Sequence, residues 1–281
     1  MSDKRHVGVL RVVSIVVLFN NEHEVLDFAE RLNRQSISKN IILVIVVNSR
    51  GAMTEAQFQR GLMNLEIESQ IYRPTENLGY LNGLIYGYEE FSKTSASPLW
   101  IAMSNSDIDF DDDRFFERFL EHEYDEQTWM VGPSVFSPQT GSYANPHALK
   151  RRTIHDINRW LCVFRWPILA YYYWKLANTK DRFLKRSKQA SRPLYSVHGC
   201  FFFVRRDFAE LLSRKKYGAL MYSEEGYLGE ITRLNNMTCY YNSDVEVIHF
   251  ANTVTSKLGI AKTSKYVVDS LEFLKREFYS S

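Results

Sequence analysis

The segment that most constrains the fold is Ile41 to Val47, which is apolar at every position and rich in β-branched residues. Such a run predicts a strand covered on both faces, as in a parallel sheet between two layers of helices. A similar run precedes it at Arg11 to Phe19, and apolar residues recur at helical spacing between the two (Val25, Phe28, Ala29 and Leu32). These segments predict a βαβ unit.

The same alternation continues through the first half of the chain. Helices are expected at 54–63 and 79–91, and strands at 69–72 and in the apolar segment that begins at Pro98. After residue 128 the expected strands are shorter (130–136, 200–204, 238–241 and 245–249), and a closing helix is expected from Lys262. The expected fold is α/β, with a single Rossmann-like, mostly parallel sheet flanked by helices.

Length and cysteine content agree with an intracellular globular protein. The chain has 281 residues, 45% of them hydrophobic, which is enough for one large domain over 1–281. Its three cysteines (Cys162, Cys200 and Cys239) are far apart and show no metal-ligand spacing. We therefore expect three free thiols in a reducing compartment.

Positive charge is concentrated in the segment 150–192. This segment has 12 Lys and Arg residues against 2 acidic ones, whereas the rest of the chain has 23 against 31. It also holds three of the five tryptophans (Trp160, Trp166 and Trp174) and the run Tyr171 to Tyr173. Such a mixture is typical of segments that lie on anionic membranes, so we expect a basic aromatic helical insertion that contacts a membrane and no nucleic acid. The alternative is a solvated insertion whose aromatic residues pack on the rest of the protein.

Polar and acidic residues follow the strand that begins near Pro98. Asn105, Asp107 and Asp109 alternate at period two, so in an extended segment their side chains would leave the same face. Oxygen ligands of this kind hold hard divalent cations, which in turn hold phosphates. The alternative is an acidic turn that supplies N-terminal charge to a helix at 114–121.

Several further motifs occur in a fixed order around this loop. They are Val13 to Asn20, Val44 to Ser49, Asn77 to Gly83 and Asn105-Ser106-Asp107, followed by Gly199 to Arg206, Tyr222-Ser223-Glu224-Glu225 and Val247-Ile248-His249. In this order the chain resembles glycosyltransferase family 2, the inverting GT-A enzymes, and especially its bacterial rhamnosyltransferase-like members. The resemblance implies a GT-A fold with a nucleotide-binding half over 1–128 and an acceptor-binding half over 129–281, which includes 150–192.

The resemblance implies that the ends of the first two strands frame the base and ribose of a nucleotide. Phe19, Asn20 and Glu22 follow the first strand, and Asn48 ends the second. The family often has Asp where Asn48 stands, which leaves the identity of the base open. A turn-forming Asn is the alternative at this position.

The motif Asn77 to Gly83 opens a helix whose backbone N–H groups could face a diphosphate. Asn77 and Gly79 stand at the helix start, where Gly79 permits close approach, and Asn82 belongs to the same motif. The alternative is a simple Asn cap with glycines packed against the sheet.

The metal motif has two registers. By resemblance, the family's Asp-x-Asp pair falls on Asn105-Ser106-Asp107, whereas the residues alone suggest Asp107-Ile108-Asp109. We expect Asp107 to bind Mn²⁺ or Mg²⁺, Asn105 to contact the ribose or sugar, and Asp109 to support or replace a ligand. His249 matches the family's late histidine, which can complete the metal ligands, although a core or capping histidine is the alternative.

An inverting transfer needs a base for the acceptor hydroxyl. Glu224 and Glu225 stand where the family has its acidic pair at a helix start, and the second acid is usually the base. We therefore expect Glu225 to be the base and Glu224 to contact the acceptor. Helix N-terminal charge beside Ser223 is the alternative.

The resemblance implies an enzyme that moves a sugar from a nucleotide-diphosphate sugar, with UDP or dTDP expected, to a hydroxyl of a glycan or polyprenyl-linked glycan. The expected process is synthesis of a surface polysaccharide such as capsule or lipopolysaccharide O-antigen. The expected location is cytoplasmic, on the inner face of the cell membrane, and a homo-oligomer is left open. A metal-dependent nucleotidyltransferase is disfavoured because no Lys- or Arg-bearing glycine-rich loop follows the first strand. A non-catalytic membrane-binding module would leave the acids at 105–109 and 224–225 without a shared purpose.

Overall fold

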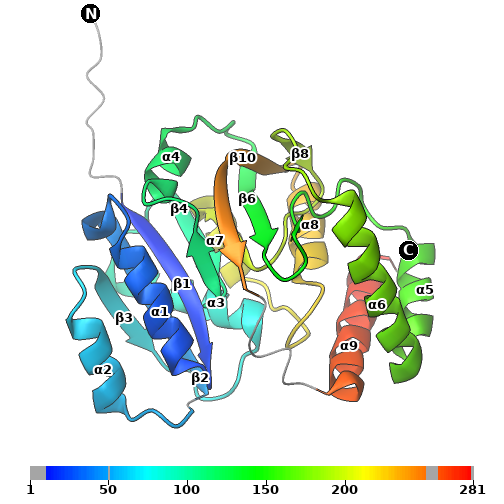
Figure 1. The fold of residues 1–281 in the computed structure, drawn as a ribbon, viewed down its shortest axis with the longest axis horizontal. Helices are drawn as coiled ribbons and strands as arrows, with labels where there is room; N and C mark the ends of the chain where they lie inside the picture. The colour runs from blue at the N-terminus through cyan, green and yellow to red at the C-terminus, as the bar shows by residue number, and fades with distance from the viewer. Residues whose placement is uncertain (1–10, 50, 251–258, 280–281) are drawn as a thin grey trace, which may run out of the picture.

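The computed structural model describes residues 11–49, 51–250 and 259–279 (Figure 1). Its centre is one ten-stranded sheet whose main path runs β3-β2-β1-β4-β9-β6-β10-β5. The first four positions on this path are parallel, as the apolar runs predict. Their bounds are Val12–Phe19 for β1, Ile41–Ser49 for β2, Glu68–Tyr72 for β3 and Trp100–Ser104 for β4.

Beyond β4 the sheet is mixed, because the chain returns across it in both directions. The central strand β9 (Phe201–Arg205) is antiparallel to β4 and to β6 (Thr128–Ser137). At the far edge β10 (Thr238–His249) is parallel to β6 and antiparallel to β5 (Ile108–Phe110). Two short strands extend this part, β7 (Ser142–Tyr143) beside β6 and β8 (Arg192–Leu194) beside β10.

The two strands expected at 238–241 and 245–249 are one strand. The polar residues between them lie in a register shift between Asn242 and Glu246, where β10 bulges against β6 without ending. Asn242 is fully buried there and donates to the Tyr124 hydroxyl at 2.7 Å. A bulge accommodates extra residues while the flanking ladder continues, so the polar interruption is not a turn.

Helices cover both faces of the sheet. On one face α1 (Glu22–Asn33), α2 (Glu55–Met63) and α4 (Phe115–Glu121) share one core with alternate residues of the strands, α1 beside β1 and α4 beside β10. On the other face α3 (Tyr80–Thr94) packs on the intervening residues of β1 and β2, whereas α7 (Arg206–Ser213) lies against β4, β6 and β9, and α8 (Glu224–Leu234) lies against β10. A short 3₁₀ helix, Ser38–Asn40, leads into β2.

The segment 150–192 is largely helical, as its sequence predicts. It forms α5 (Ile154–Phe164) and α6 (Pro167–Leu184), which pack with the closing helix α9 (Ile260–Phe278) at the right of Figure 1. None of the described helices is both long enough and apolar enough to cross a bilayer. The three cysteines are free thiols, as expected.

Candidate active site

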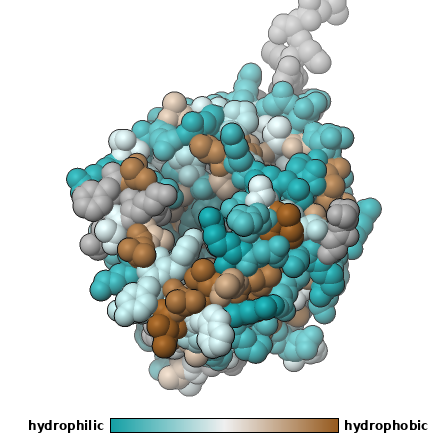
Figure 2. Space-filling view, turned by 90° about the vertical axis from the view of Figure 1, so that its right-hand side faces the viewer, coloured by the Kyte–Doolittle hydropathy of each residue, from teal (hydrophilic) through white to brown (hydrophobic). Residues whose placement is uncertain are grey.

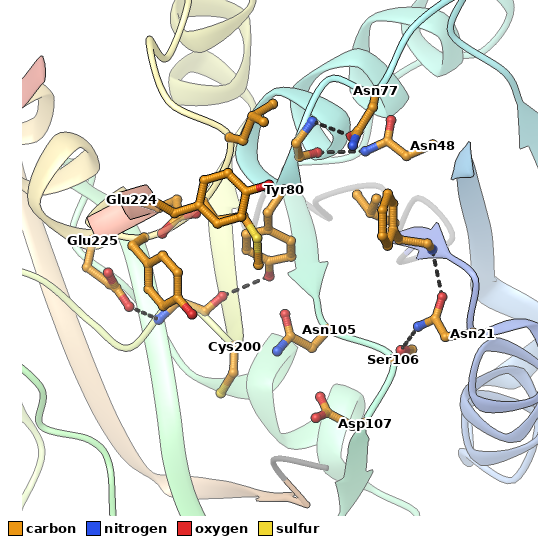
Figure 3. A pocket seen from close by; sticks show the side chains of 18 of the residues that line it. Asn21, Asn48, Asn77, Tyr80, Asn105, Ser106, Asp107, Cys200, Glu224 and Glu225 are labelled. Carbon is orange, nitrogen blue, oxygen red and sulfur yellow. Dashed lines mark hydrogen bonds between the residues drawn. The ribbon is translucent and has the colours of Figure 1, made fainter. Parts of the chain in front are cut away.

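A cavity of about 440 Å³ lies where several strands of the sheet end (Figure 3). Its walls come from the ends of β1 and β2, the start of α3, the loop after β4, the turn before β9, the start of α8, and the first turns of α9. Open α/β sheets bind ligands at such strand ends, and these elements are far apart in the sequence. The cavity is therefore the candidate active site.

Asp107 and His249 meet on one side of this cavity. The antiparallel pairing of β5 with β10 brings the residue after Ser106 beside the end of β10, and His249 Nε2 lies 3.4 Å from Asp107 Oδ1. Burial alone would lower the pKa of His249, but Cys200 and Asp107 raise it to about 10. Asp107 is nearly buried, with its side chain 9% exposed, and it lines the cavity. Asn105, also in the cavity wall, completes this polar group (Figure 3).

Asp109 does not join them. Its carboxylate is 3.7 Å from Arg31 Nε and 3.5 Å from an Arg34 nitrogen, and it is absent from the cavity wall. The period-two argument fails because the segment is not one strand: β4 ends at Ser104 beside β1, whereas β5 begins at Ile108 beside β10. The geometry therefore favours the register Asn105-Ser106-Asp107.

Glu224 and Glu225 line the opposite wall, at the start of α8 (Figure 3). Their electrostatic surroundings differ. Burial, and then the neighbouring charge of Glu225, raise the pKa of Glu224 to about 8. Burial would also raise the pKa of Glu225, but His147 and His198 hold it below its ordinary value. Glu225 Oε1 also accepts a hydrogen bond from the Gly199 N–H at 3.1 Å. One carboxyl is therefore neutral and the other anionic near pH 7.

A layer of basic side chains lies behind Glu225. His147 and His198 are 5.4 Å apart between ring centroids, and Arg152 is held with its guanidinium 3.9 Å from the Trp160 ring centroid. Burial lowers the pKa of His147 to about 4, so near pH 7 the positive charge beside Glu225 comes from His198 and Arg152. Cys200 and Glu225 instead outweigh burial at His198 and raise its pKa.

The nucleotide-binding residues implied by the resemblance fall into two groups. Those in the cavity wall are Phe19, Asn48, Asn77, Gly79 and Asn105. Outside it, Asn20 and Glu22 hold the loop after β2: Asn20 accepts from the Ser49 hydroxyl, and Glu22 accepts from the Gly51 N–H. The Asn82 amide nitrogen donates a hydrogen bond to the Tyr217 carbonyl, and its oxygen accepts one from the Tyr217 N–H. These three residues shape the walls from behind.

The amide of Asn48 is occupied by the chain itself. Its nitrogen donates to the Gly79 carbonyl at 2.7 Å, and its oxygen accepts from the Leu78 N–H at 3.3 Å. The start of α3 is similarly closed, because the Gly79 N–H donates to Asn77 Oδ1 and the Tyr80 N–H donates to the Leu220 carbonyl. These polar groups bond one another and stabilise the cavity wall. The geometry therefore favours the interpretation of Asn77 and Gly79 as a helix cap over their interpretation as a phosphate-binding site.

Several cavity residues were not among the expected ligands. Asn21 accepts from the Phe19 N–H at 2.7 Å and donates to Ser106 Oγ at 2.7 Å, which joins the ends of β1 and β4. Tyr80 donates to the Gly199 carbonyl at 2.8 Å. Cys200 contributes a thiol, and α9 contributes Lys262 and Tyr266. Tyr80 and Cys200 stand inside the quoted motifs, but the two α9 residues carry no motif and only the tertiary fold brings them here.

Gly79 provides a stability prediction. Its φ is +78°, and an added Cβ would lie 2.3 Å from the Leu220 carbonyl oxygen. We expect Gly79→Ala to lower the free energy of unfolding by about 2–4 kcal/mol, measured by chemical denaturation. Gly141→Ala is the matched control, because φ is +61° there but nothing lies within 4 Å, so it should cost about 1 kcal/mol. Equal losses would show that the contact with Leu220 is unimportant.

Comparison with known proteins identifies the fold. No family model matches the sequence, and no curated protein sequence matches it. Among solved structures, a mannosyltransferase from Pyrobaculum calidifontis in complex with GDP-Man and Mn²⁺ matches with a TM-score of 0.54 at 11% identity, over 85% of this chain and 56% of its own. The chain has a GT-A glycosyltransferase fold. GalNAc-T7 with UDP, GalNAc and Mn²⁺ also matches, with a TM-score of 0.58 at 12% identity, over 95% of this chain and 48% of its own. The chain thus spans about half the length of these two structures.

Proposed function

We propose that this protein is an inverting glycosyltransferase that moves a sugar from a nucleotide-diphosphate sugar to a hydroxyl group. One observation carries the proposal: in a GT-A fold, a single cavity at the strand ends is lined on one side by Asp107 and His249 and on the other by Glu224 and Glu225. This supplies a cation-binding side for a diphosphate and a proton-accepting side for an acceptor. The family 2 resemblance and the rhamnosyltransferase-like branch remain part of the proposal.

The residues present fit a divalent metal. The carboxylate of Asp107 and the imidazole of His249, once it has released its proton to make room for the metal, would suit Mn²⁺ or Mg²⁺, and Asn105 adds an amide oxygen nearby. No set of three His, Cys, Asp or Glu side chains within the described ranges could hold a metal, so the remaining ligands would come from the donor phosphates and water. A bound divalent ion would offset the negative charge that develops on the leaving diphosphate. Both structural neighbours contain Mn²⁺.

Glu225 is the proposed base. It is the carboxylate kept anionic by the basic layer behind it, so it can accept the proton of the acceptor hydroxyl as that oxygen bonds to the anomeric carbon. The bond between the anomeric carbon and the diphosphate oxygen breaks in the same displacement, and the electron pair leaves with the diphosphate. Glu224, neutral near pH 7, can donate a hydrogen bond to the acceptor.

The remaining wall supports a nucleotide-sugar donor. Phe19 and Asn21 at the end of β1 provide a surface for the base and ribose, and Lys262 of α9 provides a positive charge for the diphosphate. UDP or dTDP is the proposed nucleotide, and the neighbours bind GDP-Man and UDP. A glycan or polyprenyl-linked glycan of a surface polysaccharide is the proposed acceptor, following the family resemblance, with the enzyme on the inner face of the cell membrane.

A donor panel tests the proposal. We expect one of the UDP-, dTDP- or GDP-sugars to raise the melting temperature in the presence of Mn²⁺ and to do so less in the presence of EDTA, because a specific ligand stabilises the folded state by mass action. Incubation with that donor and glycan acceptors should yield the nucleoside diphosphate. Release of pyrophosphate would instead identify a nucleotidyltransferase, and no stabilisation by any donor would contradict the enzyme proposal.

A further inference from the structure

Helix α6 presents an apolar face that no part of the described chain covers. Trp166 is 65% exposed, Ile168 is 72% exposed and Leu176 is 71% exposed, and other exposed apolar residues lie beside them (Leu169, Tyr171 and Tyr172). Ile168, Tyr172 and Leu176 follow each other at intervals of four residues, so they form one stripe along the helix. Figure 2 faces the side of the molecule that carries this helix, and apolar side chains gather there in a band between hydrophilic ones.

The opposite face of α6 is already used for folding. Ala170 is fully buried, and Tyr173 and Trp174 pack on Phe164 of α5 with ring centroids 5.4 and 5.2 Å apart. Val267 and Leu271 of α9 complete this small core. The exposed stripe is therefore not a poorly packed core face, because α6 has a separate inner face that meets α5 and α9.

The surroundings of the stripe are basic. Lys175 is exposed between Tyr172 and Leu176, and Arg165 precedes the helix, with a side chain that is 60% exposed and reaches Glu272 at 3.0 Å. The whole segment 150–192 has 12 basic residues and 2 acidic ones. Exposed Trp, Tyr, Leu and Ile among cations match a bilayer interface with anionic head groups in both polarity and charge.

We propose that the exposed face of α6, formed by Ile168, Leu169, Tyr172, Lys175 and Leu176 together with Trp166 just before the helix, docks on an anionic membrane surface. The apolar stripe enters the head-group region while the flanking cations remain among the lipid phosphates. A second copy of the chain is a competing occupant, but a net positive face does not complement itself. The sequence predicts membrane contact by the whole segment 150–192, and the proposal restricts that contact to one face of α6.

The core behind this face adjoins the candidate active site. Helix α5 runs antiparallel to α9: Arg151 bonds the Phe278 carbonyl, Asn158 accepts from Lys275, and Arg165 pairs with Glu272. The turn into α6 therefore lies nearer to the beginning of α9, whose Lys262 and Tyr266 line the cavity. Tyr222 belongs to the cavity wall and also packs against the core of α5, α6 and α9.

Docking here would hold the cavity near the lipid surface. The acceptor class that this favours is a lipid-linked glycan, a statement that rests on the proposed function, whereas docking itself does not. UDP, dTDP or GDP binding, measured on the same preparations, reports on the active site without any membrane.

Co-sedimentation with vesicles tests the docking face. We expect the protein to bind vesicles of equimolar phosphatidylglycerol and phosphatidylcholine and to bind phosphatidylcholine alone weakly. Ile168→Asp with Leu176→Asp should reduce binding at least about tenfold, because it removes two apolar contacts with the bilayer and adds repulsion from the anionic lipids. Met63→Asp with Leu234→Asp is the matched control, since these residues are 77% and 57% exposed on α2 and α8. Lys175→Ser should weaken binding about fivefold.

Fluorescence gives a second readout that does not depend on variant folding. Trp166 is the exposed tryptophan of the segment 150–192, whereas Trp160 and Trp174 pack against the core of α5, α6 and α9, so only Trp166 should shift to the blue on contact with vesicles. Trp166→Phe should remove the shift while binding persists. Equal binding by the α6 variant and its control, or no binding by the wild type, would overturn the proposal. So would a dimer in light scattering that the α6 variant converts to a monomer, because a second copy would then cover the face.

Discussion

We expect Asp107→Asn to remove the dependence of nucleotide binding on Mn²⁺. The carboxylate is the charged oxygen ligand of the proposed metal side, and His249 alone offers a single nitrogen. Loss of a metal-supporting carboxylate typically costs 10- to 100-fold in metal affinity, so we expect at least that loss here. Calorimetric titration with UDP, dTDP and GDP, with and without Mn²⁺, measures the effect on nucleotide binding. Electron paramagnetic resonance of free Mn²⁺ measures metal binding directly and needs no activity assay.

Asp109→Asn is the matched control for this substitution. Asp109 is two residues away and carries the same side chain, but it faces Arg31 and Arg34 outside the cavity. We expect it to leave the Mn²⁺ dependence unchanged while both variants keep a wild-type circular dichroism spectrum. If Asp109→Asn loses the metal dependence and Asp107→Asn keeps it, the register Asp107-Ile108-Asp109 is correct and the present assignment is wrong.

Local patterns predicted the parallel half of the sheet well. The apolar run Ile41 to Val47 indicates a strand buried on both faces, and β2 is buried throughout that run between helices of both layers. The sequence alone reveals burial of this kind, because a strand between two helical layers has no solvent-facing side chains and is apolar at every position. The mixed half was harder to predict, since the antiparallel position of β9 between β4 and β6 depends on contacts between distant segments.

The candidate site shows the same division. Motif order identified Asp107, His249, Glu224 and Glu225, and the structure brings all four to one cavity. The period-two rule failed at Asp109 because a change of strand partner after Ser104 breaks the alternation, and a single sequence does not record strand partners. Lys262 and Tyr266 were missed because only the packing of α9 places them at the cavity.

The same lesson applies to the basic segment. Composition marks 150–192 as cationic and aromatic, yet several of its charges serve the fold: Arg151 pairs with buried Glu230, and Arg152 stacks over Trp160. Replacing these arginines would test stability as much as membrane binding. The exposed stripe on α6 can be recognised only from the structure, which shows which apolar residues of the helix are buried against α5 and α9.

We expect Glu225→Gln to retain donor binding and to lower the rate of transfer by about 100-fold or more. A general base contributes to the transition state and little to the ground state, so the substitution lowers kcat while the donor affinity changes little. Gln keeps an oxygen that can accept the Gly199 N–H, which preserves the local structure. Glu230→Gln, on the same helix but outside the cavity wall, is the control: it should lower stability through lost contacts with Arg151 and Arg233, with little effect on kcat.

The pH dependence of donor binding in Glu224→Gln should distinguish the role of Glu224 from that of Glu225. The pKa of Glu224 is raised to about 8, so the group is neutral below that pH and becomes an anion above it. In the wild type a second negative charge in the cavity then repels the diphosphate, and donor affinity falls as the pH rises through 8. Glu224→Gln should flatten this alkaline decline and reduce kcat only slightly, whereas Glu225→Gln should keep the decline. The opposite pattern, with transfer lost in Glu224→Gln and retained in Glu225→Gln, would make Glu224 the base.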